Sequence, residues 1–283
     1  ENLTPVLTAL HTSIGKYGFK NSAKSKDIIY SSGYYGGYPV YPAENIGLET
    51  TGELFDLAYN TIDSMYTYLK DGIDEGSMIR EFTEIFTQMA RIGYKPDVIY
   101  KGLITAIDKK MGNNLFVDEK SVGGLETVAG IETINSMLMQ SHQDVIHLFP
   151  AWPCDLDGNA SFTRLRAKGA FLVSCSLNNG IIGDIIIESE AGRNCTIKNP
   201  WPGTKILIKD QNGNIITPIN IEDEKYTFST TAGGVYTITA EYNKPELMVG
   251  LVPVNFTGTD FVETTSENWY YDYSTEAKVW ANA

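Results

Sequence analysis

His142 and Trp152 lie in a stretch whose residue types are typical of a ligand-binding rim. The apolar residues before His142 recur at helical spacing, so one helix face should be buried and His142 should emerge where the helix ends. Trp152 stands between Pro150 and Pro153, which exclude a helix and fix the direction of the indole. Such aromatic faces can stack on sugar rings, so we predict that both residues contact a carbohydrate. The alternatives are a histidine whose hydrogen bonds are satisfied near the helix C-terminus and a Trp152 that packs in a core or interface.

Two glutamates are candidates for proton transfer or for binding hydroxyl groups. Glu126 follows Gly123 and Gly124, which permit close approach of a ligand, and it precedes the last predicted helix. A carboxylate so placed is a candidate general base, and the alternative is a first-turn acid that stabilises the helix N-terminus. Glu44 also precedes a helix, and its carboxylate can accept a hydrogen bond from a sugar hydroxyl or from a neighbouring backbone amide.

The segment from Lys20 to Gly47 is rich in Ser, Gly, Tyr and Pro and has no helical or strand period. Loops of this length usually serve a site. Its residues Tyr34 and Tyr35 are therefore candidates for contacts with a sugar ring, with packing as the alternative.

No motif in the sequence predicts a cofactor. A nucleophile elbow, a phosphate-binding glycine loop and a dinucleotide fingerprint are absent, and the three histidines lack metal-ligand spacing. We expect neither a cofactor nor a metal. Cys154, Cys175 and Cys195 are an odd number without metal spacing, so we expect reduced and mostly buried thiols, although a bridge between Cys175 and Cys195 stays open.

The composition is that of a globular protein, and its charge opposes anionic partners. The chain has 283 residues, 42% of them hydrophobic, and a net charge of -13. This charge opposes binding to nucleic acid or to an anionic membrane, but it does not oppose binding to a glycan. No apolar run approaches the roughly 20 residues that cross a bilayer. The first residues do not form a signal segment, so any export signal lies upstream or has been removed.

The first half of the sequence repeats the helical period. Helices are predicted over residues 5–18, 50–72, 77–93 and 96–112, with a last helix that ends at His142. Thr50 and Glu53 form a capping-box pair at the start of the second. Short connections favour antiparallel helix pairs packed side by side.

The second half alternates at the strand period. Strands are predicted over 171–177, 181–188, 206–209, 215–216, 226–229 and 235–240, with turns at sites such as Asn178-Asn179-Gly180. Regular hairpins predict an antiparallel sandwich. We expect Arg164 and Arg166 to tie this sandwich to the helices.

Three blocks of the sequence, 41–48, 137–153 and 164–173, resemble glycoside hydrolase family 95, the inverting α-L-fucosidases and their relatives. The resemblance implies an α+β multidomain protein. The later half of an α/α barrel would occupy residues 1–153, and an antiparallel β-sandwich would follow it. We assign residues 154–283 to this second domain together with an aromatic-rich tail, although the resemblance does not extend to the last 40 residues. A complete barrel needs about a dozen helices, so we expect a fragment or a remnant of such a protein.

The resemblance also implies roles for single residues. Glu126 lies close to the position of the family's water-activating aspartate. The family's Arg-His substrate pair falls on Ser32 and Gly33, which cannot replace it, and no segment here matches the family's general-acid glutamate. We therefore expect this chain alone to be inactive.

Three functions are consistent with these features. The first is an exported, extracellular or periplasmic, inverting glycoside hydrolase for fucosylated or related glycans, present as a C-terminal fragment with the missing N-terminal half as its partner. The second is a catalytically silent carbohydrate-binding or scaffolding protein of the same fold. The third is an interaction module that acts through the aromatic tail at Trp269–Tyr273.

Overall fold

The computed structural model describes residues 14–15, 18–19, 35–74, 85–110, 112–113, 130–153, 159–241, 269–271 and 280–282. The chain divides into two compact units, Glu1–Tyr242 and Asn243–Ala283. In the second unit, β14 (Trp269–Tyr271) pairs antiparallel with β15 (Trp280–Asn282). The predicted site residues lie in the first unit.

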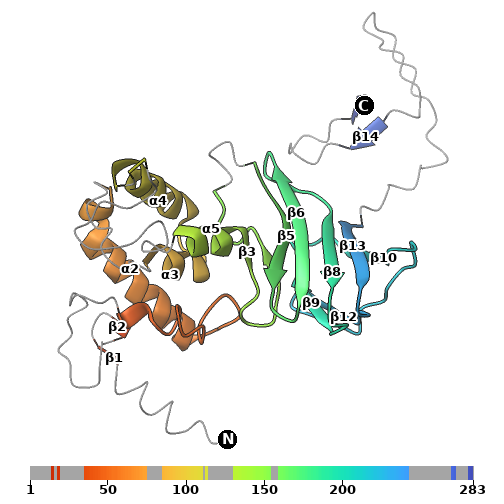
Figure 1. Ribbon diagram of the computed structural model, residues 1–283, viewed down its shortest axis with the longest axis horizontal. Helices are drawn as coiled ribbons and strands as arrows, with labels where there is room; N and C mark the ends of the chain where they lie inside the picture. The colour runs from red at the N-terminus through yellow and green to blue at the C-terminus, as the bar shows by residue number, and fades with distance from the viewer. Residues whose placement is uncertain are drawn as a thin grey trace, which may run out of the picture. The chain divides into compact units, whose positions relative to one another are not determined.

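Four α-helices in the described part of the first unit follow the predicted segments (Figure 1). They are α2 (Glu53–Asp74), α3 (Ile85–Arg91), α4 (Pro96–Lys110) and α5 (Gly130–Leu138), and a 3₁₀ turn, η1 (Tyr35–Gly37), precedes them. None of the helices in the described ranges is long and apolar enough to cross a membrane.

Their apolar stripes meet in one core. Ile62, Met89, Ile99 and Met137 are buried in it, one from each helix, and Ile46 joins them from the loop before α2. Burial of such side chains contributes about 1.5 to 3 kcal/mol each, which explains why the helical period was a reliable signal here.

Two predicted helix ends are wrong. β1 (Ile14–Gly15) pairs antiparallel with β2 (Gly18–Phe19), so the end of the predicted helix 5–18 is a short hairpin; residues 1–13 lie outside the described ranges. The last helix stops at Leu138 and not at His142. Its continuation, β3 (Met139–Gln140), pairs with β4 (His147–Leu148), which leaves His142 in the turn between them.

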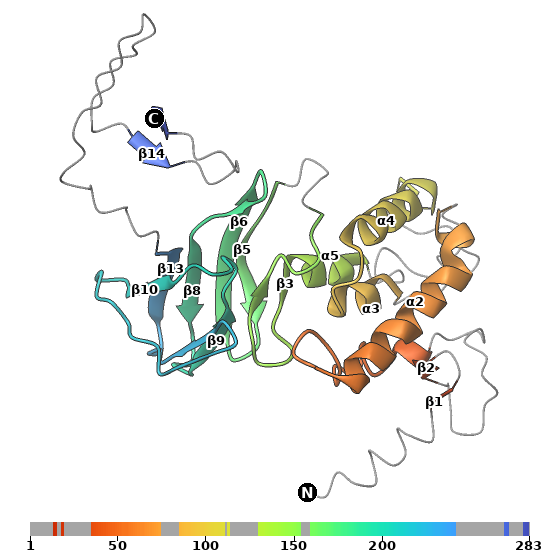
Figure 2. The ribbon, with the colours of Figure 1, turned by 180° about the vertical axis from the view of Figure 1, so that it is seen from behind.

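The β region contains two antiparallel sheets. The larger has the order β10-β13-β8-β6-β5, with β7 paired to β6 (Figure 1). Its strands are β5 (Ala160–Ala167), β6 (Phe171–Asn178), β7 (Ile181–Ile182), β8 (Ile185–Ser189), β10 (Ile206–Asp210) and β13 (Gly234–Ala240). The smaller has the order β11-β12-β9, formed by β11 (Asn220–Glu222), β12 (Lys225–Phe228) and β9 (Cys195–Lys198). Figure 2 shows β9 lying over the strands of the larger sheet.

The two sheets share a second core. Val173 and Ile187 of the larger sheet and Ile197 and Phe228 of the smaller sheet are fully buried in it. Buried residues alternate with more exposed ones along β8, β9 and β13, as expected for strands with one face on a core. The predicted order, helices followed by antiparallel sheets, is confirmed.

The finer predictions of the fold stay predictions. The described helices do not make up a barrel. The proposed boundary at Pro153 adjoins residues 154–158, which lie outside the described ranges. Residues 137–152 contribute to both cores, because Met137 and Ala151 pack in the helical core and Met139 packs in the sheet core.

Candidate functional site

A buried guanidinium is the centre of the best-defined polar site. Arg91 is the last residue of α3 and is only 6% exposed. A cation taken out of water must be paired and hydrogen-bonded, so its neighbours have to supply acceptors.

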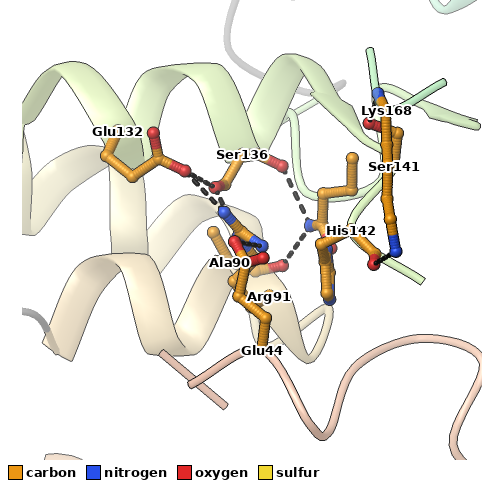
Figure 3. A network of polar contacts seen from close by, with 9 residues as sticks. Glu44, Ala90, Arg91, Glu132, Ser136, Ser141, His142 and Lys168 are labelled. Carbon is orange, nitrogen blue, oxygen red and sulfur yellow. Dashed lines mark hydrogen bonds and ion pairs between the residues drawn. The ribbon is translucent and has the colours of Figure 1, made fainter. Parts of the chain in front are cut away.

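Two carboxylates and a hydroxyl supply them (Figure 3). Arg91 Nη1 donates to Glu44 Oε1 at 3.1 Å, and Nη2 donates to Glu132 Oε1 at 2.6 Å. Arg91 Nε donates to Ser136 Oγ at 2.9 Å. Glu132 and Ser136 lie one turn apart on α5, and Glu44 comes from the loop before α2, so the Arg91 side chain ties three separate segments together.

The two carboxylates remain open to solvent. The side chain of Glu44 is 45% exposed and that of Glu132 is 36% exposed, although their Arg91 partner is buried. Each carboxylate has a second oxygen, so each can still accept a hydrogen bond from a ligand hydroxyl. The Tyr41 ring lies on the same cation, with its centroid 5.6 Å from Arg91 Cζ.

Gln140 fixes the helices around this site. Its Nε2 donates to the carbonyl oxygens of Ala90 at 2.7 Å and of Ser136 at 2.9 Å. These bonds join α3 to the end of α5 beside Arg91, and they satisfy carbonyl groups that a helix end leaves without partners.

His142 lies near this group, in the turn after β3 (Figure 3). Both ring nitrogens are buried, and neither has a hydrogen-bond partner among the described residues. Burial, followed by the positive charge of Arg91, lowers the pKa of His142 to about 4. The ring is therefore neutral at pH 7.

The backbone around His142 is held by Lys168. The Lys168 ammonium donates to the His142 carbonyl oxygen at 3.1 Å and lies 3.0 Å from the Asp144 carboxylate, and the Lys168 amide donates to Ser141 Oγ at 2.9 Å. The prediction that Arg164 and Arg166 tie the sheets to the helices is wrong. They pair with Glu188 and Glu190, which are in or next to the neighbouring strand β8.

Trp152 packs where the two cores meet. It is partly buried against both, and its ring lies 6.2 Å from the Tyr100 ring at 66°. This placement accords with the packing interpretation; a sugar contact by Trp152 stays a prediction.

The other predicted site residues are less well placed. Glu126 and Tyr34 lie outside the described residues, and Tyr35 is described only as the first residue of η1. The structure therefore brings together Glu44 and His142 of the predicted set.

Sequence reasoning missed Arg91 and Glu132. One signal was present, because Arg91 stands between Met89 and Ile92 in a run of apolar residues, where a charge is buried only if acceptors reach it. The i,i+4 spacing of Glu132 and Ser136 on one helix face was a second signal.

Comparison with known families identifies part of the chain. Residues 140–238 match the model of the glycoside hydrolase family 95 C-terminal domain. The match begins at Gln140, the second residue of β3 and two residues before His142, and it covers β4 and nearly all of the two sheets. The family resemblance predicted from the sequence is confirmed over these residues.

The other comparisons add little. No curated protein matches the chain. One similar solved structure is the catalytic domain of GH30 xylanase C from Talaromyces cellulolyticus, at 11% identity and a TM-score of 0.23. The match covers 37% of this chain and 27% of that chain.

Proposed function

We propose that this chain is the C-terminal part of an inverting glycoside hydrolase that acts on fucosylated or related glycans. The observation that carries the proposal is the match of residues 140–238 to the family 95 C-terminal domain. This matched segment contains His142 and follows directly on the helices that hold the Arg91 site, so the site adjoins a domain of a carbohydrate-processing family.

The proposed catalytic groups are a base within this chain and an acid outside it. Glu126 is the proposed base that activates water, and residues 1–153 are the later half of an α/α barrel. An inverting enzyme needs a second carboxyl group about 6.5 to 9.5 Å from the base, to make room for that water. We place this acid outside the present chain, so catalysis requires the N-terminal half of the protein.

Glu44, His142, Trp152, Tyr34 and Tyr35 are the proposed substrate contacts. Glu44 is the one that the geometry supports best. Arg91 binds one of its oxygens, which orients the carboxylate, and the exposed remainder is available to a sugar hydroxyl. The net charge of -13 imposes no penalty on a neutral glycan. We expect the protein to work outside the cell or in a periplasm, where such glycans occur.

A second candidate is a carbohydrate-binding protein that has lost its chemistry. The sequence favours it at one point, since Ser32 and Gly33 stand where the family has an arginine and a histidine. A serine hydroxyl and a glycine cannot provide a charged donor or an imidazole.

A glycan-panel screen tests both proposals. The chain and the full gene product are incubated with fucosylated glycans, and proton NMR follows the anomer released. Release of the inverted sugar by the full gene product, but not by the chain, supports the leading proposal. Binding to immobilised glycans without hydrolysis supports the second. Neither hydrolysis nor binding by either protein overturns both.

A further inference from the structure

The loop that carries Glu44 has no regular secondary structure of its own. Residues 41–50, between η1 and α2, contain no helix or strand. On the side of Glu44, the amides of Asn45 and Ile46 both donate to the Pro39 carbonyl oxygen, at 2.9 and 3.0 Å. These local bonds fix the start of the loop, and Arg91 holds the Glu44 side chain. An anchor at the far end would hold the loop backbone on both sides of Glu44.

Glu49 provides this anchor through contacts with distant parts of the chain. Its Oε1 lies 2.8 Å from His147 Nε2, and its Oε2 accepts from Lys225 Nζ at 2.8 Å. Its backbone amide donates to Gln143 Oε1 at 2.8 Å. Both carboxylate oxygens and the amide of one residue are thus bound, and all three partners come from β4, β12 or the turn before β4.

The charges in this contact support an ionised carboxylate. The Glu49 side chain is 18% exposed. Burial works to raise the pKa of Glu49, but the hydrogen bond and charge of Lys225, together with His147, hold that pKa below its ordinary value. Burial lowers the pKa of His147, so its ring is neutral at pH 7 and Nε2 donates its hydrogen to Glu49. Charge-assisted bonds of this kind are about twice as strong as neutral ones.

Packing transmits this anchor toward Glu44. Between the two residues, the Ile46 side chain is buried in the helical core. Gly47 lies so close to His142 and Gln143 that an added Cβ would be 2.4 Å from His142 Nε2 and 2.6 Å from Gln143 Oε1. The loop therefore has no room to slide along the turn that contains His142.

From this geometry we infer that Glu49 is a positioning residue, through which His147 and Lys225 of the β region set the place of Glu44. The β region would then contribute to the geometry of the site through these two residues. Only the carbohydrate readout below depends on the proposed function; the positioning of the loop does not.

Hydrogen exchange of single amides tests the inference in the whole chain. In Glu49→Gln, the amides of Glu49 and Thr50 should exchange about tenfold faster, since a hydrogen bond to a charged group contributes roughly that factor. The amides of Asn45 and Ile46 should also exchange faster than in the wild-type chain. The matched control is Glu190→Gln, which removes the same charge from the exposed pair with Arg166 and should leave the loop amides unchanged. If the amides of Asn45 and Ile46 exchange in Glu49→Gln at the same rates as in the wild-type chain, the inference is overturned.

Lys225 variants separate positioning from general loss of stability. Lys225→Met should accelerate exchange at Asn45, and Lys225→Arg should restore it, while the Val173 and Ile187 amides in the sheet stay protected. If the Asn45 amide exchanges as fast in Lys225→Arg as in Lys225→Met, the charge at position 225 does not position the loop.

A carbohydrate readout completes the experiment. Affinity for a fucosylated glycan, measured by calorimetry, should fall about tenfold in Glu49→Gln, in line with the lost charged hydrogen bond, and not in Glu190→Gln. If neither the chain nor the full gene product binds or hydrolyses a glycan, the proposed function fails while the exchange result still decides the inference.

Discussion

The Nε2 atom of His142 faces Gly47 at a distance that leaves no room for a side chain. A methyl group on Gly47 would lie 2.4 Å from this nitrogen, closer than atoms in van der Waals contact. The imidazole is a rigid ring, and the other neighbour, Gln143, is held by its bonds to Glu49 and Thr50. Glycine is therefore required at position 47 by packing and not by its backbone freedom.

Gly47→Ala should destabilise the protein. The added methyl group forces the loop away from the turn, and overpacking of this kind costs about 1 to 3 kcal/mol. Urea unfolding followed by circular dichroism measures the change. Combining Gly47→Ala with His142→Ala removes the clash with the imidazole and leaves only the one with Gln143, so the double variant should be less destabilised than the sum of the two single variants. Simple additivity would contradict the contact.

His142 should titrate far below the usual range. Burial lowers its pKa to about 4, which NMR of the ring carbons can measure directly. The unfolded chain binds a proton near pH 6.5 and the folded chain does not, so stability should fall as the pH drops from 6.5 toward 4. His142→Gln should lose this part of the pH dependence, while the part due to His147 remains. A ring pKa of 6.5 or higher would refute the burial of His142.

Arg91→Met should be among the most damaging single changes. It leaves Glu44 and Glu132 next to each other without their shared cation, and loss of one partner from a buried charge pair costs about 3 to 5 kcal/mol. Because both carboxylates are partly exposed, we expect the lower end of this range. Arg166→Met breaks an exposed pair and should cost less than about 1 kcal/mol. Equal costs would show that the Arg91 group contributes no more than a surface contact.

Glu126→Gln should abolish most of the turnover in the full gene product. If Glu126 is the base, the amide cannot take the proton from water, and the rate should fall by a factor of at least about 10². Hydrolysis of an aryl fucoside is the assay, and Glu188→Gln on the sheet surface is the matched control. Unchanged turnover would exclude Glu126 as the base.

The thiols of Cys175 and Cys195 should be inert in the folded protein. Both are free and buried in the sheet core, which confirms the expectation of reduced thiols for these two, and burial raises the pKa of each to about 12. The thiolate is the reactive form. In Cys154→Ser, an aromatic disulfide reagent at pH 8 should modify no thiol until the protein is unfolded. Rapid reaction of a thiol in the folded variant would disprove this burial.

Local signals in the sequence predicted the elements well. The turn at Asn178-Asn179-Gly180 is where predicted, with Asn179 and Gly180 at positive φ, because only a few residue types adopt that backbone readily. The capping box predicted at Thr50 does not form, because a contact with the distant Gln143 takes its place. Its Oγ1 accepts hydrogen bonds from the Gly47 amide and from Gln143 Nε2, and α2 begins at Glu53. The early end of α5 has the same origin, since pairing of Met139 with Leu148 replaces another helical turn.

The polar site could be predicted only in part. Glu44 and His142 stood out by residue type and by the family resemblance. The partners of Arg91 lie 47 positions away at Glu44 and 41 positions away at Glu132, so no local pattern connects them. Only the packing of α3 against α5 and the loop brings these charges together.

The bond between Glu49 and Lys225 also bears on how the protein is made. The two residues are 176 positions apart. When the helices have left the ribosome, most of both sheets must still be synthesised before Lys225 emerges. Until then the Glu49 carboxylate lacks its ion-pair partner from β12. Contacts of such long range slow folding. The helices should therefore reach their final stability only late in synthesis, and a chain truncated before β12 should be exposed to proteases at the loop before α2.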